Sequence, residues 1–352
     1  MEFIRPGTKI DFLGRRKIAF SLSVTLILIT ILLLIYRGGP NLGVDFSGGV
    51  LIQIKLGGPQ SPSDIKEALR PVDLQDSIIQ EFGERGESEY LIRVRETAVE
   101  STGLSEKVER ALSDRFGSGV EIRRVEMVGP KVGEDLRRKA LYSIFFAILF
   151  IAIYISGRFE LKWLMSIIMA GSLAMAVYVT SRFNVSVTWL IVVALVVTIG
   201  LCWVMKLKYA MGAIIALIHD VTITIGAFAL TDREISLSII AALLTIVGYS
   251  LNDTIVVFDR IRENLKRFRR RNIEDVMNSS INETLSRTLL TSMTTLIVVV
   301  ALFILGGGVI HDFAFAMLVG ILVGTYSSIF VASPIILVWE GGFQGKGNVR
   351  DS

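Results

Sequence analysis

The sequence contains few of the residue types from which disulfides and metal sites are built. Among its 352 residues there are one cysteine and two histidines. No disulfide can form within the chain, and the sequence predicts no metal site. The single cysteine, Cys202, lies in an apolar run. A Gly-Lys-Ser or Gly-Lys-Thr phosphate-binding loop is also missing, as is any hydrolase or transferase motif, so we expect neither an enzyme nor a bound cofactor.

Apolar residues are abundant. They make up 52% of the chain, against 20% for charged residues, and a soluble fold could not bury that much apolar surface. The composition therefore predicts an integral membrane protein. A membrane core about 30 Å thick is crossed by roughly 20 apolar residues in a helix. Eight runs approach this length: 18–36, 139–156, 163–181, 187–205, 209–230, 235–257, 288–309 and 313–338.

Basic residues around these runs predict the orientation. Residues 1–17 are basic, which by the positive-inside rule places this N-terminal segment in the cytoplasm. With eight spans, the tail at 339–352 returns to the cytoplasm, as does the arginine-rich segment 258–287, which we expect to be a basic loop. No small-residue cleavage site follows the first run, 18–36, so this run is expected to stay as a signal-anchor.

One long polar segment, 38–138, separates the first two runs and is therefore placed outside the cytoplasm. Ile52, Ile54 and Leu56 alternate with other positions, which indicates a strand. The sequence Ser-Pro-Ser-Asp at 61–64 is typical of a helix start. Further strands are expected at 76–82, 89–96 and 119–128, and a second helix at 103–116. The resulting β-α-β-β-α-β order predicts a small ferredoxin-like α+β domain.

Two charged residues stand in or at the edge of apolar runs: Asp253 in the sixth run and Arg287 before the seventh. A charge at bilayer depth costs roughly 2.5–3.5 kcal/mol, so each is a candidate functional residue. An acid and a cation on successive spans favour a proton relay, in which the two side chains alternately pair and separate. The alternative is a static ion pair that only fixes helix packing.

Other polar residues accompany the two charges. Arg287, Thr291 and Thr294 have the i, i+4, i+7 spacing of one helix face. A second polar row lies beside it and consists of Thr288, Ser292 and Thr295. A half-polar helix in lipid should face protein or water, so we expect a hydrated groove in which Asp253 meets Arg287.

A possible secondary polar site comprises Asp220, His219, Asn252, Thr291 and Thr294. Asp220 lies near the middle of the run at 209–230, beside His219. A carboxylate at this depth needs a partner. Two roles stay open for Asp220: a second proton site, or a hydrogen-bonded contact between packed helices.

Several motifs resemble those of one protein family. Gly43-Val44-Asp45-Phe46-Ser47-Gly48-Gly49 is similar to the signature that follows the first helix of SecF. The stretch 248–264, GYSLNDTIVVFDRIREN, is close to the longest SecF signature, and 286–292 resembles the start of the next SecF span. The matches run in the family's order, so the chain resembles the SecF members of the SecD/SecF family. A junction motif between the first span and the outer segment consists of Gly43, Asp45, Phe46, Gly48 and Gly49.

The resemblance implies a fold and a function. SecF resembles one helical half of a transporter of the RND superfamily, and with SecD it helps the SecYEG channel by pulling exported preproteins across the bacterial inner membrane. The implied energy source is the proton-motive force, and Asp253 and Arg287 fall at the positions associated with proton passage. SecD, SecYEG, preproteins and membrane lipid are the implied partners, and nucleic acid is not. A small-molecule transporter half of RND type and a non-transporting membrane assembly factor are the alternatives.

The chain departs from the family in one respect. SecF usually has six spans, whereas eight apolar runs are present here. A family loop motif is divided between residues 158–163 and residues 208–212. We therefore expect 163–207 to be an inserted helical hairpin, which preserves the orientation of the spans that follow.

Overall fold

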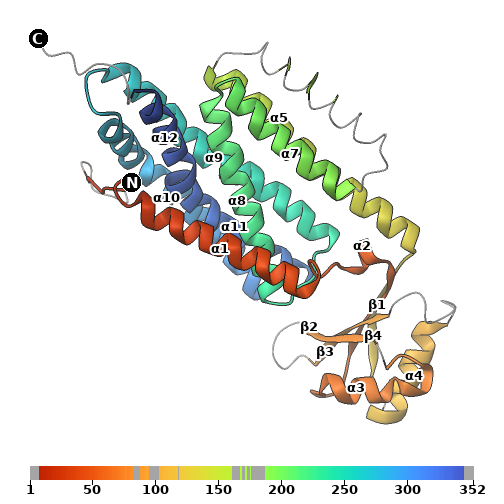
Figure 1. Ribbon diagram of the computed structural model, residues 1–352. Helices are drawn as coiled ribbons and strands as arrows, with labels where there is room; N and C mark the ends of the chain where they lie inside the picture. Colours follow the sequence, from red (N-terminus) through yellow and green to blue (C-terminus); the bar gives the residue numbers. More distant parts are fainter. Residues whose placement is uncertain are drawn as a thin grey trace, which may run out of the picture.

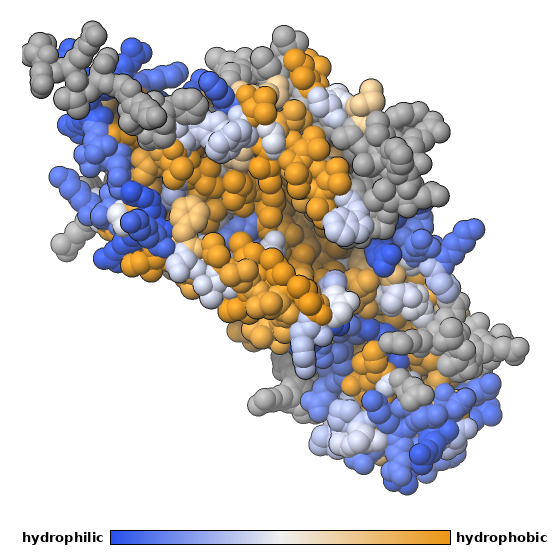
Figure 2. All heavy atoms as spheres, in the orientation of Figure 1, coloured by the Kyte–Doolittle hydropathy of each residue, from blue (hydrophilic) through white to orange (hydrophobic). Residues whose placement is uncertain are grey.

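The computed structural model describes residues 8–75, 77–82, 88–94, 103–117, 119–160, 167–168, 171–172, 175 and 187–344. These residues form a bundle of long helices with a small α+β domain at one end (Figure 1). Figure 2 shows apolar side chains along the bundle, whereas polar side chains cover the α+β domain and gather at the opposite end of the bundle. This distribution is that of a helix bundle in lipid with both ends in water.

Six helical stretches among the described residues are long and apolar enough to cross a membrane: Arg16–Arg37, Pro130–Phe159, Lys208–Leu230, Leu237–Arg267, Ile273–Leu305 and Ile310–Glu340. They coincide with six of the eight predicted runs, which confirms a polytopic helical membrane protein. Another helix, α7 (Val187–Val204), covers the run predicted at 187–205. In the run predicted at 163–181, the described residues 167–168, 171–172 and 175 are helical, and the others lie outside the described residues. The inserted hairpin therefore stays a prediction.

The spanning helices are α1 (Arg16–Arg37), α5 (Pro130–Glu160), α8 (Lys208–Leu230), α9 (Leu237–Arg267) and α10 (Ile273–Leu305), followed by α11 (Gly308–Ser327), the π-helical turn η3 (Ser328–Ala332) and α12 (Ser333–Gln344). The last three are continuous and make one span. The first turn of α1 and the last turn of α12 lie at the end of the bundle away from the α+β domain (Figure 1).

The segment 258–287, expected as a basic loop, is almost entirely helical. Helix α9 continues to Arg267 and α10 begins at Ile273, so only 268–272 connect them. The reason is an apolar stripe that persists beyond the lipid: Phe258 and Ile261 on α9 are buried, as are residues on α10 that face the same core. Asn264 Nδ2 also donates a hydrogen bond to Ser280 Oγ at 3.0 Å. The expectation of a loop was wrong because the arginines occupy the exposed side of a helical hairpin.

Helix α11 packs against α9 through small residues. A Cβ atom added to Gly320 would lie 2.3 Å from Ile246 Cδ1, and one added to Gly324 would lie 2.9 Å from Ser250 Cβ. Such positions allow two helices to approach closely in a membrane. The close approach brings the polar side chains of both helices together in the middle of the bundle.

The α+β domain, which is predicted to lie outside the cytoplasm and is called the outer domain for that reason, contains β1 (Gly49–Lys55), α3 (Pro62–Ala68), β2 (Ile78–Phe82), β3 (Glu89–Val94), α4 (Leu104–Phe116) and β4 (Glu121–Val128). This is the predicted order of elements. The strands form one antiparallel sheet in the order β2-β3-β1-β4. Ile65 of α3 and Val108 of α4 share a core with one face of this sheet. Ser61 accepts a hydrogen bond from the N–H of Asp64, so it caps α3 as expected.

The opposite face of the sheet looks toward the helix bundle. A cleft of about 970 Å³ lies between them, lined by Leu51, Gln53 and Gln80 from the sheet and by loops at the bundle end, among them 231–234. Arg93 on β3 forms an ion pair with Glu234, which belongs to the loop 231–234 at the bundle end. The domain is thus attached to the bundle by a charge pair as well as by the chain itself.

The segment before α1 is bound to α10. Asn278 accepts a hydrogen bond from the N–H of Phe12 at 2.9 Å and donates one to the carbonyl of Ile10 at 2.8 Å. Asn282 donates to the same carbonyl at 2.8 Å, and Arg16 forms an ion pair with Glu274. The basic N-terminal segment, as far as residues 8–16 are concerned, is therefore docked on the helical hairpin of α9 and α10.

Candidate functional site

Asp253 lies in the interior of α9 with only 2% of its surface exposed. Its Oδ2 accepts a hydrogen bond from Ser292 Oγ of α10 at 3.2 Å. Ser292 Oγ is also 2.7 Å from Thr325 Oγ1 of α11. The carboxylate therefore sits where α9, α10 and α11 meet, with a hydroxyl pair as its direct contact. We expected Asp253 to lie in a hydrated groove, whereas in this structure it is buried among three helices.

Arg287 occupies a different side of α10. Its side chain is exposed at the surface of this chain, and among the described residues it forms no ion pair with Asp253. Consecutive residues of an α-helix are rotated by about 100°, so Arg287 points about 140° away from Ser292, five positions later. The row that faces Asp253 is the second polar row, in which Thr288 and Ser292 are buried. The direct meeting of Asp253 and Arg287 that we expected is not present in this conformation.

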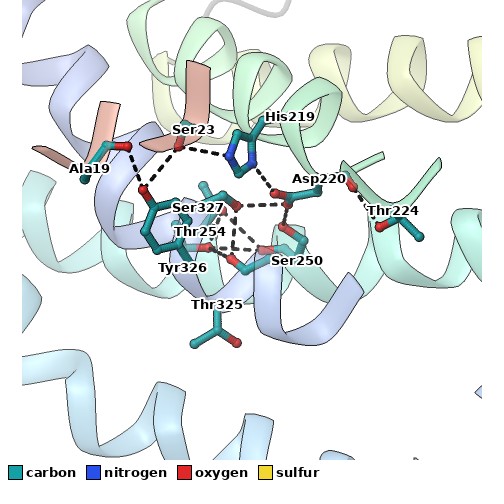
Figure 3. A network of polar contacts seen from close by, with 12 residues as sticks. Ala19, Ser23, His219, Asp220, Thr224, Ser250, Thr254, Thr325, Tyr326 and Ser327 are labelled. Atoms are coloured by element: carbon teal, nitrogen blue, oxygen red, sulfur yellow. Dashed lines mark hydrogen bonds and ion pairs between the residues drawn. The ribbon is translucent and has the colours of Figure 1, made fainter. Parts of the chain in front are cut away.

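A second carboxylate, Asp220 of α8, is completely buried. Its Oδ2 accepts hydrogen bonds from Ser250 Oγ of α9 at 2.6 Å and from Ser327 Oγ of α11 at 2.9 Å. Its Oδ1 lies 2.9 Å from Nδ1 of His219, which is itself 2% exposed. Figure 3 shows these side chains converging on the carboxylate from α8, α9 and α11.

The imidazole of His219 extends this network to α1. Its Nε2 lies 3.1 Å from Ser23 Oγ. Ser23 Oγ is 3.2 Å from Tyr326 Oη, and Tyr326 donates to the carbonyl of Ala19 at 2.8 Å. The tyrosine and histidine rings are stacked with centroids 6.0 Å apart. The chain of contacts runs from α9 through α8 to α1 (Figure 3).

The residues of the predicted secondary polar site are not all together. His219 and Asp220 share the network just described, whereas Thr291 bonds to the backbone carbonyls of Arg287 and Thr288 on its own helix. Asn252 and Thr294 are exposed. The structure thus separates the buried pair on α8 from Thr291, which is half-buried beside Asp253, and from the exposed Asn252 and Thr294.

The junction motif connects the outer domain to the start of α9. Asp45 lies in α2 (Val44–Ser47), and its Oδ2 accepts a hydrogen bond from the N–H of Leu237 at 2.7 Å. The N–H of Gly43 donates to the carbonyl of Ile235 at 3.0 Å. Phe46 is buried in the bundle core. The motif is therefore a docking segment that holds the loop between α8 and α9.

The motif glycines permit this close fit. Gly48 has a φ of 71°, and a Cβ atom there would lie 3.0 Å from Cα of Pro130. A Cβ atom on Gly133, in the first turn of α5, would lie 3.0 Å from the N atom of Gly48. Glycine at both positions lets the entrance and the exit of the outer domain cross in contact. Gly49 also has a positive φ, 122°.

Comparison with known proteins agrees with these motifs. A family model described as "Protein export membrane protein SecD/SecF, C-terminal" matches residues 107–202 and 186–342. The two matched ranges overlap at residues 186–202, nearly all of which lie in α7. A second model, the SecD/SecF GG motif, matches residues 37–60, which contain the junction motif.

The chain belongs to the SecF group of the SecD/SecF family. The protein translocase subunit SecF of Magnetococcus marinus is 41% identical over 350 residues, covering 98% of this chain and 97% of the relative. The SecF subunit of Calditerrivibrio nitroreducens is 40% identical and covers 96% of each chain. The crystal structure of SecDF, a translocon-associated membrane protein from Thermus thermophilus, is 30% identical with a TM-score of 0.70. That match covers 95% of this chain but 39% of the longer SecDF chain.

Several residues of the networks around Asp253 and Asp220 were not predicted from the sequence. They are hydroxyl residues in otherwise apolar helices: Ser23, Ser250, Thr325, Tyr326 and Ser327. A signal was present in α11, where Thr-Tyr-Ser-Ser occupies positions 325–328 within an apolar run. Among the described residues, no group of three or more His, Cys, Asp or Glu side chains could hold a metal ion.

Proposed function

We propose that this chain is an auxiliary subunit of the Sec protein-export machinery that uses the proton-motive force to promote the late, ATP-independent movement of preproteins across the inner membrane. The observation that carries this proposal is the buried carboxylate of Asp253 at the meeting point of three spans. A carboxylate at this depth is costly, and in membrane proteins such groups mark ion or proton pathways. The SecF names of the relatives support protein export as the process.

A SecD-like chain is the partner that we propose. Asn252, Arg287 and Thr294 are exposed on α9 and α10. Polar groups at this depth should face protein or water rather than lipid, so a second helical half would cover this face. The length of the Thermus SecDF chain supports the same view, because this chain matches 39% of it. We propose that the two halves form a pseudo-twofold pair of RND-like bundles.

In the proposed relay, Asp253 loads and releases a proton while Arg287 changes its distance from the carboxylate. Arg287 lies within electrostatic reach of Asp253 without being paired to it. Because Arg287 lies on another side of α10 from Ser292, the relay requires a movement of α10 relative to α9 that brings the guanidinium toward the acid. One proton that crosses 100 mV supplies about 2.3 kcal/mol, so moving a long polypeptide requires repeated cycles.

The outer domain is the proposed moving part. We propose a ferredoxin-like fold for it, which its β-α-β-β-α-β order and its four-stranded antiparallel sheet support, and we place it on the extracytoplasmic side. The basic hairpin of α9 and α10 and the segment before α1 then lie in the cytoplasm, as the positive-inside rule requires. Because the junction motif binds the start of α9, motion of that helix would act directly on the domain. SecYEG and the exported preprotein are the further partners in this proposal.

The experiment is proton-gradient-dependent completion of preprotein translocation in inner-membrane vesicles, with wild type compared with Asp253→Asn. Co-purification with SecD is measured in the same membranes, and Thr245→Val is the matched control. Thr245 lies on the same helix, is exposed, and bonds only to its own backbone. We expect Asp253→Asn to assemble but to lose the gradient-dependent step. Normal translocation by an assembled Asp253→Asn variant would instead favour a non-transporting assembly factor.

A further inference from the structure

The pair formed by His219 and Asp220 is an acid–base pair that the proposed relay does not use. Asp220 is completely buried, and His219 is the only basic side chain in contact with it among the described residues. Tyr326 of α11 is the other titratable group that faces the pair. Asp253 of α9 lies three residues beyond Ser250 but faces α10 through Ser292. From α1, only the hydroxyl of Ser23 reaches the pair.

The protons of the network can be assigned by following its donors. The hydroxyl of Tyr326 donates its single hydrogen to the carbonyl of Ala19, so its contact with Ser23 is a hydrogen bond only when Ser23 donates. Ser23 then has no hydrogen left for His219, and the contact of Nε2 with Ser23 Oγ is a hydrogen bond only when Nε2 donates. In the state in which all three contacts are hydrogen bonds, His219 carries a proton on Nε2.

The contact between Nδ1 of His219 and Oδ1 of Asp220 holds a second proton. At 2.9 Å these two atoms form a hydrogen bond, and a hydrogen bond needs one proton between them. That proton belongs either to an imidazolium beside a carboxylate or to a carboxylic acid beside a neutral imidazole. In both cases the pair has no net charge, which is the state that a dry core favours.

We propose that His219 and Asp220 together form a second proton-binding site in the bundle, and that loss of its exchangeable proton releases the contact with α1. When the proton shared in the hydrogen bond between His219 Nδ1 and Asp220 Oδ1 is lost to bulk water, a lone pair on Nδ1 would face the carboxylate of Asp220. The remaining imidazole proton moves from Nε2 to Nδ1, which restores that hydrogen bond. Nε2 then becomes an acceptor, and Ser23 must donate to it instead of to Tyr326.

This exchange changes how α1 is held. Only three residues of α1 are buried, namely Ala19, Ser23 and Thr30, and the first two belong to the network. Helix α1 leads directly into the junction motif and the outer domain. A switch at Ser23 therefore acts within α1 between two ion pairs at its ends, Arg16 with Glu274 and Arg37 with Asp232, and the far end of α1 is connected to the proposed moving part. This last step rests on the proposed function, whereas proton binding by the pair does not.

The test of proton binding uses the full chain in lipid nanodiscs with ¹⁵N-labelled histidine. The chain has two histidines, so His311→Gln leaves His219 as the single signal. The ¹⁵N spectrum is recorded at several pH values across the range in which the nanodiscs and the folded chain remain intact. We expect Nε2 to change from protonated to unprotonated as the pH rises, and we expect Asp220→Asn to abolish this change.

Thr224→Val, made in the His311→Gln parent, is the matched control, because Thr224 Oγ1 donates only to the backbone carbonyl of Asp220. The His219 signal of this variant should respond to pH as it does in the parent. A His219 signal that keeps one protonation state throughout, or an Asp220→Asn variant that titrates like the parent, would overturn the proton site. In vesicles, Ser23→Ala should assemble with SecD and lose gradient-dependent translocation. Translocation at the wild-type rate by Ser23→Ala would overturn the coupling to α1, while the fate of Asp253→Asn reports separately on the main relay.

Discussion

The carboxylate of Asp45 accepts a hydrogen bond from the backbone N–H of Leu237 at 2.7 Å. Leu237 is the first residue of α9, and the first N–H groups of a helix have no partner within the helix. A residue of the junction motif thus caps, from a distant part of the sequence, the same helix that carries Asp253. The outer domain and the membrane carboxylate are connected through one rigid element.

Replacing this cap should weaken both stability and coupling. Asp45→Ala is expected to lower the free energy of unfolding by about 1 kcal/mol, the usual effect of losing a cap, and to reduce gradient-dependent translocation. Thermal unfolding in detergent and the vesicle assay measure the two effects. Asp114→Ala removes an exposed carboxylate from α4 of the same domain and should change neither.

The contact between α9 and α11 leaves no room for a methyl group. Gly320→Ala should destabilise the bundle by about 1–3 kcal/mol, because the new Cβ would overlap the side chain of Ile246. The double variant Gly320→Ala, Ile246→Ala should recover part of this loss in a thermal-unfolding cycle. Gly248 is exposed on α9, and no atom lies near a Cβ added there, so Gly248→Ala should leave the stability unchanged or raise it. If Gly248→Ala lowered the stability as much as Gly320→Ala, steric overlap would not be the cause.

The ion pair between Arg93 and Glu234 should hold the outer domain on the bundle. Both side chains are largely buried, with 7% and 16% of their surface exposed. Glu234→Gln removes one charge and leaves the other buried, at a cost of about 3 kcal/mol. We expect faster proteolysis at the junction, monitored by mass spectrometry. The charge-swapped variant Arg93→Glu, Glu234→Arg should restore part of the protection, because it remakes the pair but loses the hydrogen bonds from Arg93 to Asn41 and to the carbonyl of Leu42. No restoration at all would contradict a role of charge pairing in the attachment.

Ser292 is the hydroxyl that we expect to matter for Asp253. Ser292→Ala removes the donor to the carboxylate, and a hydrogen bond to a charged group contributes about 1.5–3 kcal/mol. The gradient-dependent rate of translocation should fall while assembly with SecD persists. Thr295→Val, in the same polar row but bonded only to the backbone of its own helix, should retain the rate. Equal effects from both variants would contradict a specific role for Ser292.

The sequence was sufficient for much of the architecture, for clear physical reasons. Long apolar runs predict spans because lipid tolerates few charges, and the alternation at Ile52 and Ile54 predicts a strand whose core face is now seen to be buried. The helical hairpin at 258–287 was missed because its apolar stripe is narrow and its arginines dominate the composition. The sequence marked Asp253 as a candidate because it stands in an apolar run, but it predicted a hydrated groove rather than the burial that is observed.

The partners of the two carboxylates could not be predicted in the same way. Spacing identifies residues that share a helix face but does not say which face looks inward, and on α10 the inward row contains Ser292 rather than Arg287. The contacts of Asp220 come from α9 and α11, and they depend on helix rotations that only packing determines. Small hydroxyl residues carry most of these contacts, and they are too common in sequences to stand out.

The attachment of the N-terminal segment to α10 has a consequence for how the protein is made. Ile10 and its partner Asn282 are separated by 272 positions. Ile10 therefore leaves the ribosome long before Asn282 has been synthesised. During insertion, the start of the chain must wait beside the membrane without its partner until the hairpin of α9 and α10 has entered. Docking of this segment therefore comes after synthesis of the start of α10 and does not depend on the last span, α11 to α12.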